Sequence, residues 1–169
     1  NRPDCNSIYK LAKEVAVALK TTCREPEIAY GTVEGDVKDF VSVDVKNNAL
    51  CPRYMASAVK NVKVCPSEYK IRQRLHAVGI RPINNIVDIT NYVLTEIGQP
   101  MHAFDLRDLG GNAIIVRNAE NGEEIVTLDG KKNVLNENML VIADANRPVA
   151  VAGVMGGEYS GIMGDTTTI

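Results

Sequence analysis

Side chains that could do chemistry gather in three segments of this 169-residue sequence. The first segment, residues 81–93, mixes apolar residues with polar ones of middling helix propensity: Asn84, Asn85, Asp88, Thr90 and Asn91. Because asparagine and threonine are mediocre helix formers, something beyond propensity must hold them in a helix. Two interpretations are open. The polar residues cap the helix and fix its packing through buried hydrogen bonds, or they form a polar rim that orients a substrate.

The second segment, residues 98–105, reads Gly-Gln-Pro-Met-His-Ala-Phe-Asp. Histidine is the usual side chain for proton transfer near neutral pH and also a frequent metal ligand. His102 has only Asp105 close by in sequence, and two ligands do not make a metal site, so we expect none here. The alternative is a structural histidine that bonds to a backbone group.

The third segment, residues 152–157, reads Ala-Gly-Val-Met-Gly-Gly and follows an apolar run. Clustered glycines allow positive φ and a close approach of a ligand to backbone amides. The spacing fits neither the dinucleotide fingerprint nor a P-loop, because lysine and serine or threonine are missing from the required places. A tight turn between packed strands is the alternative. Without further knowledge, the residues predict a pocket around Thr90, Asn91, His102, Ala152 and Gly153.

Composition sets the class of protein that must position these residues. The chain is 45% hydrophobic and 24% charged, with a formal net charge of -2, which is typical of a globular protein with a packed core. A charge this close to zero argues against nucleic-acid binding by bulk electrostatics alone, but leaves room for a local basic patch. No apolar run is long enough to span a membrane. The first residue is Asn1 and not methionine, as expected for a piece of a longer chain.

The cysteines bear on metal binding and on cellular location. The sequence has 4 of them and no CxxC pair, so a zinc site is not expected. Since no signal peptide directs the chain to an oxidising compartment, we expect free thiols and a cytoplasmic protein.

Helical periodicity predicts helices in the first half of the chain. One contains Ile8 to Leu19, with Asp4, Asn6 or Ser7 as its cap. Ser67 is expected to cap a second helix that ends at Gly79, and a third runs from about Asn85 to Glu96 and ends before Gly98 and Pro100.

Alternating and β-rich runs predict strands, most of them late in the sequence. They are Val41–Val45, Tyr54–Val64, Ala113–Arg117, Glu124–Leu128, Lys132–Leu135, Leu140–Ala143 and Val149–Val154. Asp129-Gly130 is a strong hairpin signal. The predicted fold class is therefore α+β, with helices in the first half and mostly antiparallel strands in the second.

Five motifs occur in an order that identifies a family. They are Asn1-Arg-Pro-Asp-Cys, the run from Gly79 to Val93, Gly98-Gln-Pro-Met-His-Ala-Phe-Asp, Thr127-Leu-Asp-Gly and Ala152-Gly-Val-Met-Gly-Gly. Over essentially its whole length the sequence resembles the B3/B4 editing domain of bacterial phenylalanyl-tRNA synthetase beta chains. The resemblance implies that residues 1–169 are a fragment of that domain within a larger beta subunit, truncated on the C-terminal side.

The resemblance implies hydrolysis of tyrosine wrongly attached to the phenylalanine tRNA, in support of phenylalanine–tRNA ligation. An apolar synthetic pocket rejects an added hydroxyl only by about a hundredfold, so a second site must remove the error. That site should bind the tyrosine hydroxyl with a buried polar partner. The alternative functions are a non-catalytic tRNA-binding or assembly module of the same subunit, and a tRNA-binding domain of similar fold attached to another enzyme.

The resemblance also implies roles for individual residues. Arg81 matches an arginine that contacts the terminal ribose or phosphate of the tRNA. Thr90 and Asn91 match residues that hold the amino group or an attacking water. His102 matches a histidine that positions the tRNA end or the water, and its role as a general base is left open.

The remaining implications concern the walls of the pocket and its partners. Pro100 belongs to the substrate-binding set, while Ala152 and Gly153 leave room for the aromatic ring and offer backbone amides. The glutamate that binds the tyrosine hydroxyl in the family lies just past Ile169. Expected partners are the acceptor end of tRNA(Phe) and the synthetase alpha subunit of a heterotetramer, with no membrane. No metal or cofactor is expected in this domain, since ATP and Mg²⁺ are used elsewhere in the parent enzyme.

Overall fold

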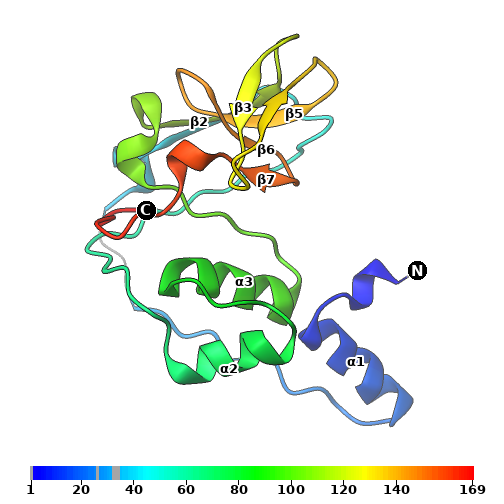
Figure 1. The fold of residues 1–169 in the computed structure, drawn as a ribbon. Coiled ribbons are helices and arrows are strands. Elements are labelled where there is room, and N and C mark those ends of the chain that lie inside the picture. The colour runs from blue at the N-terminus through cyan, green and yellow to red at the C-terminus, as the bar shows by residue number, and fades with distance from the viewer. Residues whose placement is uncertain (1, 26, 32–34) are drawn as a thin grey trace. The chain divides into compact units, whose positions relative to one another are not determined.

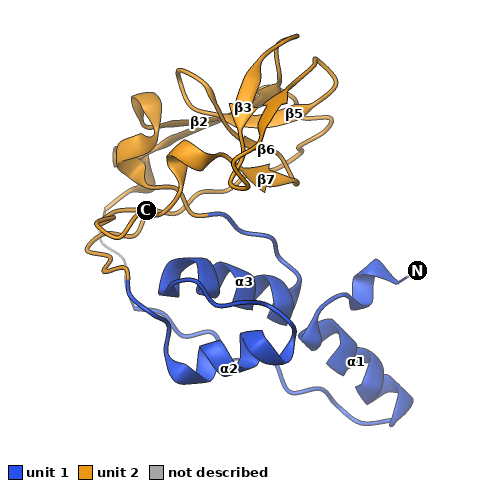
Figure 2. Cartoon of the chain, in the orientation of Figure 1, with its two compact units in different colours: residues 1–34, 65–102 blue, residues 35–64, 103–169 orange. Residues whose placement is uncertain are grey.

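The computed structural model describes residues 2–25, 27–31 and 35–169. The chain forms two compact units, shown in separate colours in Figure 2. Unit 1 comprises residues 1–34 and 65–102, and unit 2 comprises residues 35–64 and 103–169. No helix in the described ranges is long and apolar enough to cross a membrane.

Local sequence signals set the ends of two helices of unit 1 (Figure 1). Helix α1 (Ile8–Ala18) begins after Ser7, whose Oγ accepts a backbone N–H of the first turn at 3.2 Å. Helix α3 (Asn85–Ile97) begins after Asn84, whose side-chain oxygen accepts two backbone N–H groups. It ends at Gly98, where φ is 81°, the left-handed conformation that favours glycine as a helix stop. Both predicted helices are confirmed, with Ser7 as the cap of α1 among the three predicted candidates and Gly98 as the predicted stop of α3.

The second helix is also confirmed, but its predicted cap is wrong. Helix α2 spans Tyr69–Ala77 and is preceded by Glu68, which makes no side-chain capping bond. The Ser67 hydroxyl instead donates to the Asp88 carboxylate of α3 at 2.5 Å. Ser67 therefore ties the entry of α2 to the neighbouring helix, a tertiary contact that sequence spacing does not reveal.

The main sheet of unit 2 has the strand order β1-β2-β5-β6-β7. Its strands are β1 (Ser42–Val45), β2 (Ala113–Asn118), β5 (Leu140–Ala143), β6 (Pro148–Val151) and β7 (Met155–Gly156). β1 and β2 are parallel, and the other neighbours are antiparallel. Parallel neighbours need a long crossover, and the chain between β1 and β2 contains both α2 and α3. The predicted α+β class with mostly antiparallel strands is confirmed.

A separate hairpin joins β3 (Glu124–Val126) to β4 (Lys132–Val134). Its loop contains the predicted Asp129-Gly130 turn, and Gly130 has a φ of 74°. The Thr127 hydroxyl donates to the Asp129 carboxylate at 2.5 Å, which holds the loop closed. The hairpin prediction is confirmed.

The predicted strand at Tyr54–Val64 is wrong. Among the described residues this run forms no strand of a sheet. It meets the end of the chain at one bridge, between Lys60 and Thr168, beside which Val59 and Ile169 exchange two backbone hydrogen bonds. The alternation has another cause, because Tyr54 and Ala56 pack against the core while Met55 between them faces solvent. The predicted last strand, Val149–Val154, is shorter than expected and ends at Val151.

Buried side chains cover both faces of the unit 2 sheet. Successive residues of a strand point to opposite faces. On β5, Val141 belongs to one buried cluster, while its neighbour Ile142 packs against the other. The clusters consist of Val41, Phe104, Leu109, Ile114 and Val149, and of Ala119, Ile125, Leu135, Val141 and Ala143. Unit 2 therefore has a core of its own on each side of its sheet.

Candidate functional site

A buried hydrogen-bond frame fixes the N-terminal half of α3 within unit 1. The Asp88 side chain is completely buried and accepts from the Ser67 hydroxyl at 2.5 Å and from the Ile83 N–H at 2.7 Å. Asn85 bonds the backbone of Cys65 twice, through its own N–H at 2.8 Å and its side-chain oxygen at 3.1 Å. For these residues the interpretation as packing and capping groups is confirmed.

Thr90 and Asn91 follow this frame on α3 and are only half-buried. The Thr90 hydroxyl donates to the Val87 carbonyl at 2.8 Å, which uses its proton and leaves its oxygen as an acceptor. The Asn91 side-chain amide makes no hydrogen bond with the described part of the chain, although its backbone carbonyl accepts from Thr95. The helix thus offers an acceptor and a donor–acceptor amide on consecutive residues.

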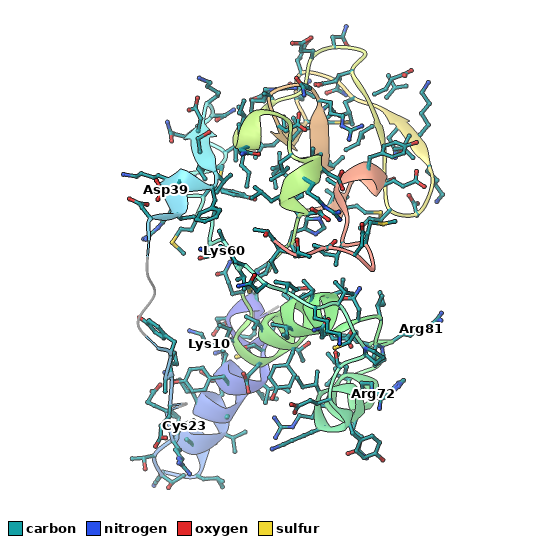
Figure 3. The ribbon with its side chains drawn as sticks, turned by 90° about the vertical axis from the view of Figure 1, so that its left-hand side faces the viewer. Lys10, Cys23, Asp39, Lys60, Arg72 and Arg81 are labelled. Carbon is teal, nitrogen blue, oxygen red and sulfur yellow. The ribbon has the colours of Figure 1, made fainter. Side chains whose placement is uncertain are left out.

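Arg81 lies in the segment that leads into α3, and its side chain is exposed. Within the described ranges its guanidinium makes no hydrogen bond or ion pair, and in Figure 3 it extends away from the ribbon. A guanidinium fork matches phosphate and carboxylate geometry, so an arginine without an internal partner suits an anionic ligand. Arg81, Thr90 and Asn91 all belong to unit 1, and that they form one site stays a prediction.

Pro100 and His102 lie in the segment that follows α3, also in unit 1. The His102 side chain keeps access to solvent, yet neighbouring protein atoms remove part of its hydration. This desolvation lowers the pKa of the imidazole from its ordinary value. The ring is therefore neutral at pH 7, with one nitrogen as a donor and the other as an acceptor.

Asp105, the carboxylate nearest to His102 in sequence, is committed to a structural network in unit 2. Its buried side chain accepts from the Thr166 hydroxyl at 2.6 Å and from the Arg107 guanidinium at 2.7 Å. The hydrogen bond from Arg107 is the main reason that the pKa of Asp105 falls to about 2. Arg107 also pairs with Asp165 at 3.0 Å. Asp105 thus holds the last residues of the chain against the 3-10 helix Leu106–Asp108 and is not a free metal ligand.

One group of potential metal ligands does occur among the described residues. Asp4, Cys5 and Glu14 bring one ligand atom each within 4.8 Å of one another near the start of α1. Both carboxylates already pair with Arg2, at 2.7 Å and 3.0 Å. The group is therefore a surface ion-pair network.

Ala152 and Gly153 lie in unit 2, in the turn between β6 and β7. The Val154 N–H bonds the Val151 carbonyl at 3.0 Å, and Gly153 has a φ of 70°. A Cβ added to Gly157 would lie 2.7 Å from the backbone oxygen of Val149, which shows how closely the two segments pack. The tight-turn interpretation is confirmed, and contact of Ala152 and Gly153 with a ligand stays a prediction.

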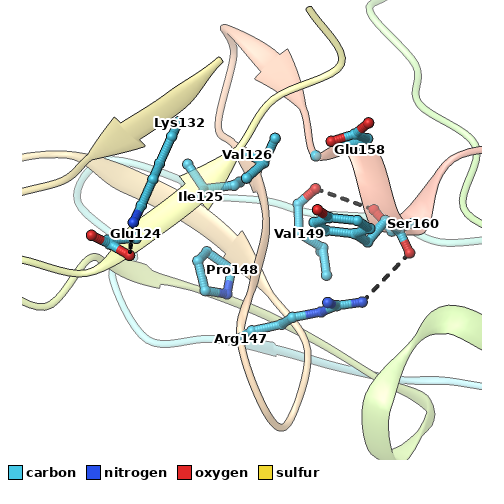
Figure 4. Close-up of a pocket in the computed structure, with 11 residues that line it drawn as sticks. Glu124, Ile125, Val126, Lys132, Arg147, Pro148, Val149, Glu158 and Ser160 are labelled. Carbon is cyan, nitrogen blue, oxygen red and sulfur yellow. Dashed lines mark hydrogen bonds and ion pairs between the residues drawn. The ribbon is translucent and has the colours of Figure 1, made fainter. Parts of the chain in front are cut away.

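Two surface hollows involve residues that sequence reasoning did not select. In unit 2 a hollow of about 200 Å³ lies over Ile125 and Val149 (Figure 4). Its rim includes the Arg147 guanidinium, 5.4 Å from the Tyr159 ring centre. A shallower hollow of about 360 Å³ lies in unit 1, between the segment from Cys5 to Leu11 and residues Leu94 and Thr95. Neither hollow contains a predicted site residue. Each is lined by the last residue of one of the five motifs, Gly157 in unit 2 and Cys5 in unit 1.

Comparison with known proteins agrees with these observations. The B3/4 domain family model matches residues 50–169. The phenylalanine–tRNA ligase beta subunit of Carboxydothermus hydrogenoformans is 50% identical over 171 residues, covering 100% of this chain and 21% of that protein. The beta subunits of Desulfotalea psychrophila and Aliivibrio fischeri are 49% and 47% identical over 170 residues, with the same coverage. The chain thus spans about a fifth of the length of these relatives. Since the family model matches well over half of its residues, the chain belongs to the B3/4 domain family.

Proposed function

We propose that this chain is part of a phenylalanine–tRNA ligase beta subunit and that it hydrolyses the ester between tyrosine and tRNA(Phe). The named relatives support the first half of this proposal. The observation that carries the second half is the division of polar groups on α3. Asn84, Asn85 and Asp88 are engaged in holding the backbone, whereas the Asn91 amide has no partner in the described part of the chain.

The reaction depends mainly on the correct placement of a water molecule and the ester, and it does not need unusually reactive side chains. The oxygen of a water molecule bonds to the ester carbonyl carbon, and the bond to the terminal ribose oxygen then breaks. The ribose oxygen takes up a proton, so that tyrosine and an uncharged tRNA end are released. Holding the water and the ester in a reactive geometry supplies most of the acceleration in such a mechanism. No metal or organic cofactor is needed for these steps.

Each unit 1 residue has a role that fits its surroundings. The Thr90 oxygen accepts from the ammonium group of the substrate, and the Asn91 amide holds that group or the water. The neutral His102 ring accepts a hydrogen bond from the water or orients the tRNA end. Arg81 binds a phosphate or ribose of that end. The proline ring at Pro100 restricts the backbone just before His102.

The same proposal includes the larger enzyme to which the chain belongs. The chain is a truncated part of a beta subunit that works with an alpha subunit, and ATP and Mg²⁺ serve the ligation reaction elsewhere in the enzyme. The predicted roles of Ala152 and Gly153 in unit 2 stay predictions.

The test is the release of tyrosine from tyrosyl-tRNA(Phe) by the intact alpha–beta enzyme. Replacing Asn91 with alanine should slow tyrosine release at least about tenfold, the effect of losing one positioning bond worth about 1.4 kcal/mol. Charging with phenylalanine should be unchanged. Thr95→Ala, on the same helix, is the matched control because its hydroxyl only bonds the Asn91 carbonyl.

An intact wild-type enzyme that leaves tyrosyl-tRNA(Phe) untouched would sink the hydrolase proposal. If that enzyme still binds the tRNA, and binding weakens with Arg81→Ala, the non-catalytic tRNA-binding module is the correct function. Equal tyrosine release by the Asn91 variant and wild type would remove Asn91 from the site.

A further inference from the structure

Helix α2 and the segment after it carry a run of cations with no acidic residue among them. Residues 69–87 include Lys70, Arg72, Arg74 and Arg81 and no aspartate or glutamate, in a chain whose formal net charge is -2. Within the described ranges none of these four side chains makes an ion pair. Like charges repel one another, so such a run suits an anionic partner from outside the chain better than it suits the isolated fold.

The cations of α2 lie on its solvent-exposed side. Leu75 is 1% exposed and Ile71 is half-buried, and these two residues mark the side that packs inside unit 1. Because successive residues turn by about 100° around a helix, Lys70 and Arg74 are neighbours on one flank of the exposed side, and Arg72 lies on the other flank. All three side chains are exposed. An anionic ligand that lies across α2 can therefore reach cations on both flanks.

An exposed aromatic ring lies between these two flanks. Tyr69 is 67% exposed, and the Arg72 guanidinium lies 5.9 Å from the centre of its ring. The Gln73 amide donates a hydrogen bond to the Tyr69 hydroxyl at 2.8 Å. The ring is therefore held at the surface by residues of its own helix. An exposed ring beside arginine is the kind of platform on which unpaired nucleobases stack.

Arg74 is held by a neutral group on α3. Its guanidinium donates a hydrogen bond to the Tyr92 hydroxyl and lies 5.8 Å from the centre of the Tyr92 ring. The Tyr92 hydroxyl donates in turn to the Glu96 carboxylate at 3.3 Å. Contact with a phenol fixes the position of Arg74 without pairing its charge directly. Arg74 thus joins the cations of α2 to the helix that carries Thr90 and Asn91.

We propose that Tyr69, Lys70, Arg72 and Arg74, called here the α2 basic surface, bind the unpaired 3′ strand of a tRNA next to its esterified end. The lysine and the arginines contact phosphates of this strand, and the Tyr69 ring stacks on one of its bases. This inference rests on the proposed function, which assigns Arg81 to a phosphate or ribose of the same tRNA end.

Two features favour RNA over an acidic protein as the partner. One is the exposed ring of Tyr69, because every nucleobase offers a face for stacking. The other is the place of Arg81, which follows α2 after only a short segment. In Figure 3, Arg72 and Arg81 extend from unit 1 on the same side of the view. A tRNA end held at Arg81 therefore brings its preceding nucleotides toward α2.

The test measures binding of tRNA(Phe) to the intact alpha–beta enzyme. One tRNA carries tyrosine through a stable amide in place of the ester, and a second tRNA lacks its unpaired 3′ nucleotides. Lys70→Gln combined with Arg72→Gln removes two exposed cations and keeps a good helix former at both positions. The matched control is Lys10→Gln combined with Lys20→Gln. These two lysines are exposed in unit 1 and make no ion pair with the described part of the chain.

The α2 double variant should bind the tyrosine-bearing tRNA about tenfold more weakly at low salt, as expected for two exposed charge contacts. Each phosphate contact on a single strand contributes about 0.7 to the slope of log K against log salt, so this slope should fall by about 1.4. Tyr69→Leu should weaken binding at least about fivefold without changing the slope, because it removes stacking and no charge. The α2 variants should bind the trimmed tRNA as wild type does, and the α1 control should bind both tRNAs as wild type does.

Several results overturn the inference. Equal losses with the two tRNAs show that α2 contacts another part of the tRNA, and an equal loss in the α1 control shows that only net charge matters. Unchanged binding of both tRNAs shows that the cations of α2 are merely solvated. Weaker assembly of the alpha and beta subunits in the α2 double variant assigns the surface to a protein partner.

The binding readout does not depend on catalysis. An enzyme that shows the expected differences in binding but does not release tyrosine from the natural ester contradicts only the proposed hydrolysis. An enzyme that releases tyrosine, while its α2 variants bind both tRNAs as wild type does, contradicts only the α2 basic surface.

Discussion

The polar residues of α3 are of two kinds: some have side chains that already make hydrogen bonds within the chain, and others do not. Asp88 is enclosed by the Ser67 hydroxyl and the Ile83 N–H, so its loss would leave buried donors without an acceptor. Asn91, three residues further along α3, has an amide with no partner among the described residues and remains half-buried. A family resemblance identifies Asn91, but only coordinates show that Asp88 is structural. Sequence reasoning left that choice open because both kinds of residue look alike in a helical pattern.

The Asp105 network makes a prediction about acid stability. The pKa of this carboxyl is about 2 in the folded chain, against an ordinary value of 3.8. A carboxyl whose pKa is lower in the folded chain than in the unfolded chain stabilises the fold at pH values above the unfolded pKa. That contribution is lost as the pH falls from about 4 to about 2. The loss is at most about 2.5 kcal/mol, from about 1.4 kcal/mol per pKa unit. The free energy of unfolding, measured with urea, should therefore differ between wild type and Asp105→Asn by an amount that becomes smaller as the pH falls over this range.

Asp108→Asn is the control for this experiment, because Asp108 is an exposed residue of the same 3-10 helix. The urea concentration at the unfolding midpoint of Asp108→Asn should equal that of wild type at every pH. A gap between Asp105→Asn and wild type that stays constant from pH 5 to pH 2 would show that the carboxyl has no unusual pKa.

His102 makes a prediction about the pH dependence of tyrosine release. An ordinary histidine is half-protonated near pH 6.5, and desolvation lowers the pKa of this one. If the neutral ring accepts a hydrogen bond from the attacking water, activity should hold as pH falls to 6.5 and decline only below it. The rate of tyrosyl-tRNA(Phe) deacylation under single-turnover conditions measures this. An inflection above pH 6.5, or a profile that is unchanged in His102→Ala, contradicts the assignment.

At the scale of helices and strands, the sequence predicted the features that nearby residues determine. It did not predict the features that depend on residues far apart in the chain. The ends of α1 and α3 follow from Ser7, Asn84 and Gly98, whose effects act within one helical turn. Tyr54–Val64 has the alternation of a strand, yet a strand also needs a neighbour along its length, and this run is paired only around Lys60, with the last residues of the chain. The parallel β1–β2 pair, in a sheet otherwise antiparallel, likewise depends on a distant pairing that periodicity does not show.

The stop signal of α3 can be tested directly. Gly98 has a φ of 81°, and a Cβ there would also lie 3.4 Å from the Ser7 Cβ. Gly98→Ala should lower the free energy of unfolding by about 1 kcal/mol, the cost of a left-handed conformation for a residue with a side chain. Thermal unfolding followed by circular dichroism measures the change. Gly161→Ala is the control, since Gly161 has a φ of -76° and ordinary contacts, and an equal effect of both changes would refute the explanation.

At the scale of the whole molecule, the two units differ in how completely each buries its own apolar side chains. Unit 2 buries clusters on both faces of its sheet, with Val116 and Val141 exposed by only 1% and 0%. In unit 1, α1 buries Ala16 but leaves Ile8, Leu11 and Val15 about half exposed. Composition predicted a chain that is able to form an apolar core. It did not predict that the two units would bury their apolar side chains to different degrees, because the hydrophobic pattern shows which side of a helix is apolar and not what covers that side.

This difference should appear in the rates of amide hydrogen exchange. Local opening is easiest where few apolar contacts must be broken, so the amides of α1 should exchange at least about tenfold faster than those of β2 and β5 in the 169-residue chain. Hydrogen exchange measured by mass spectrometry, peptide by peptide, makes the comparison. If the amides of α1 are as protected as those of β5, the uneven burial of apolar side chains has no energetic consequence.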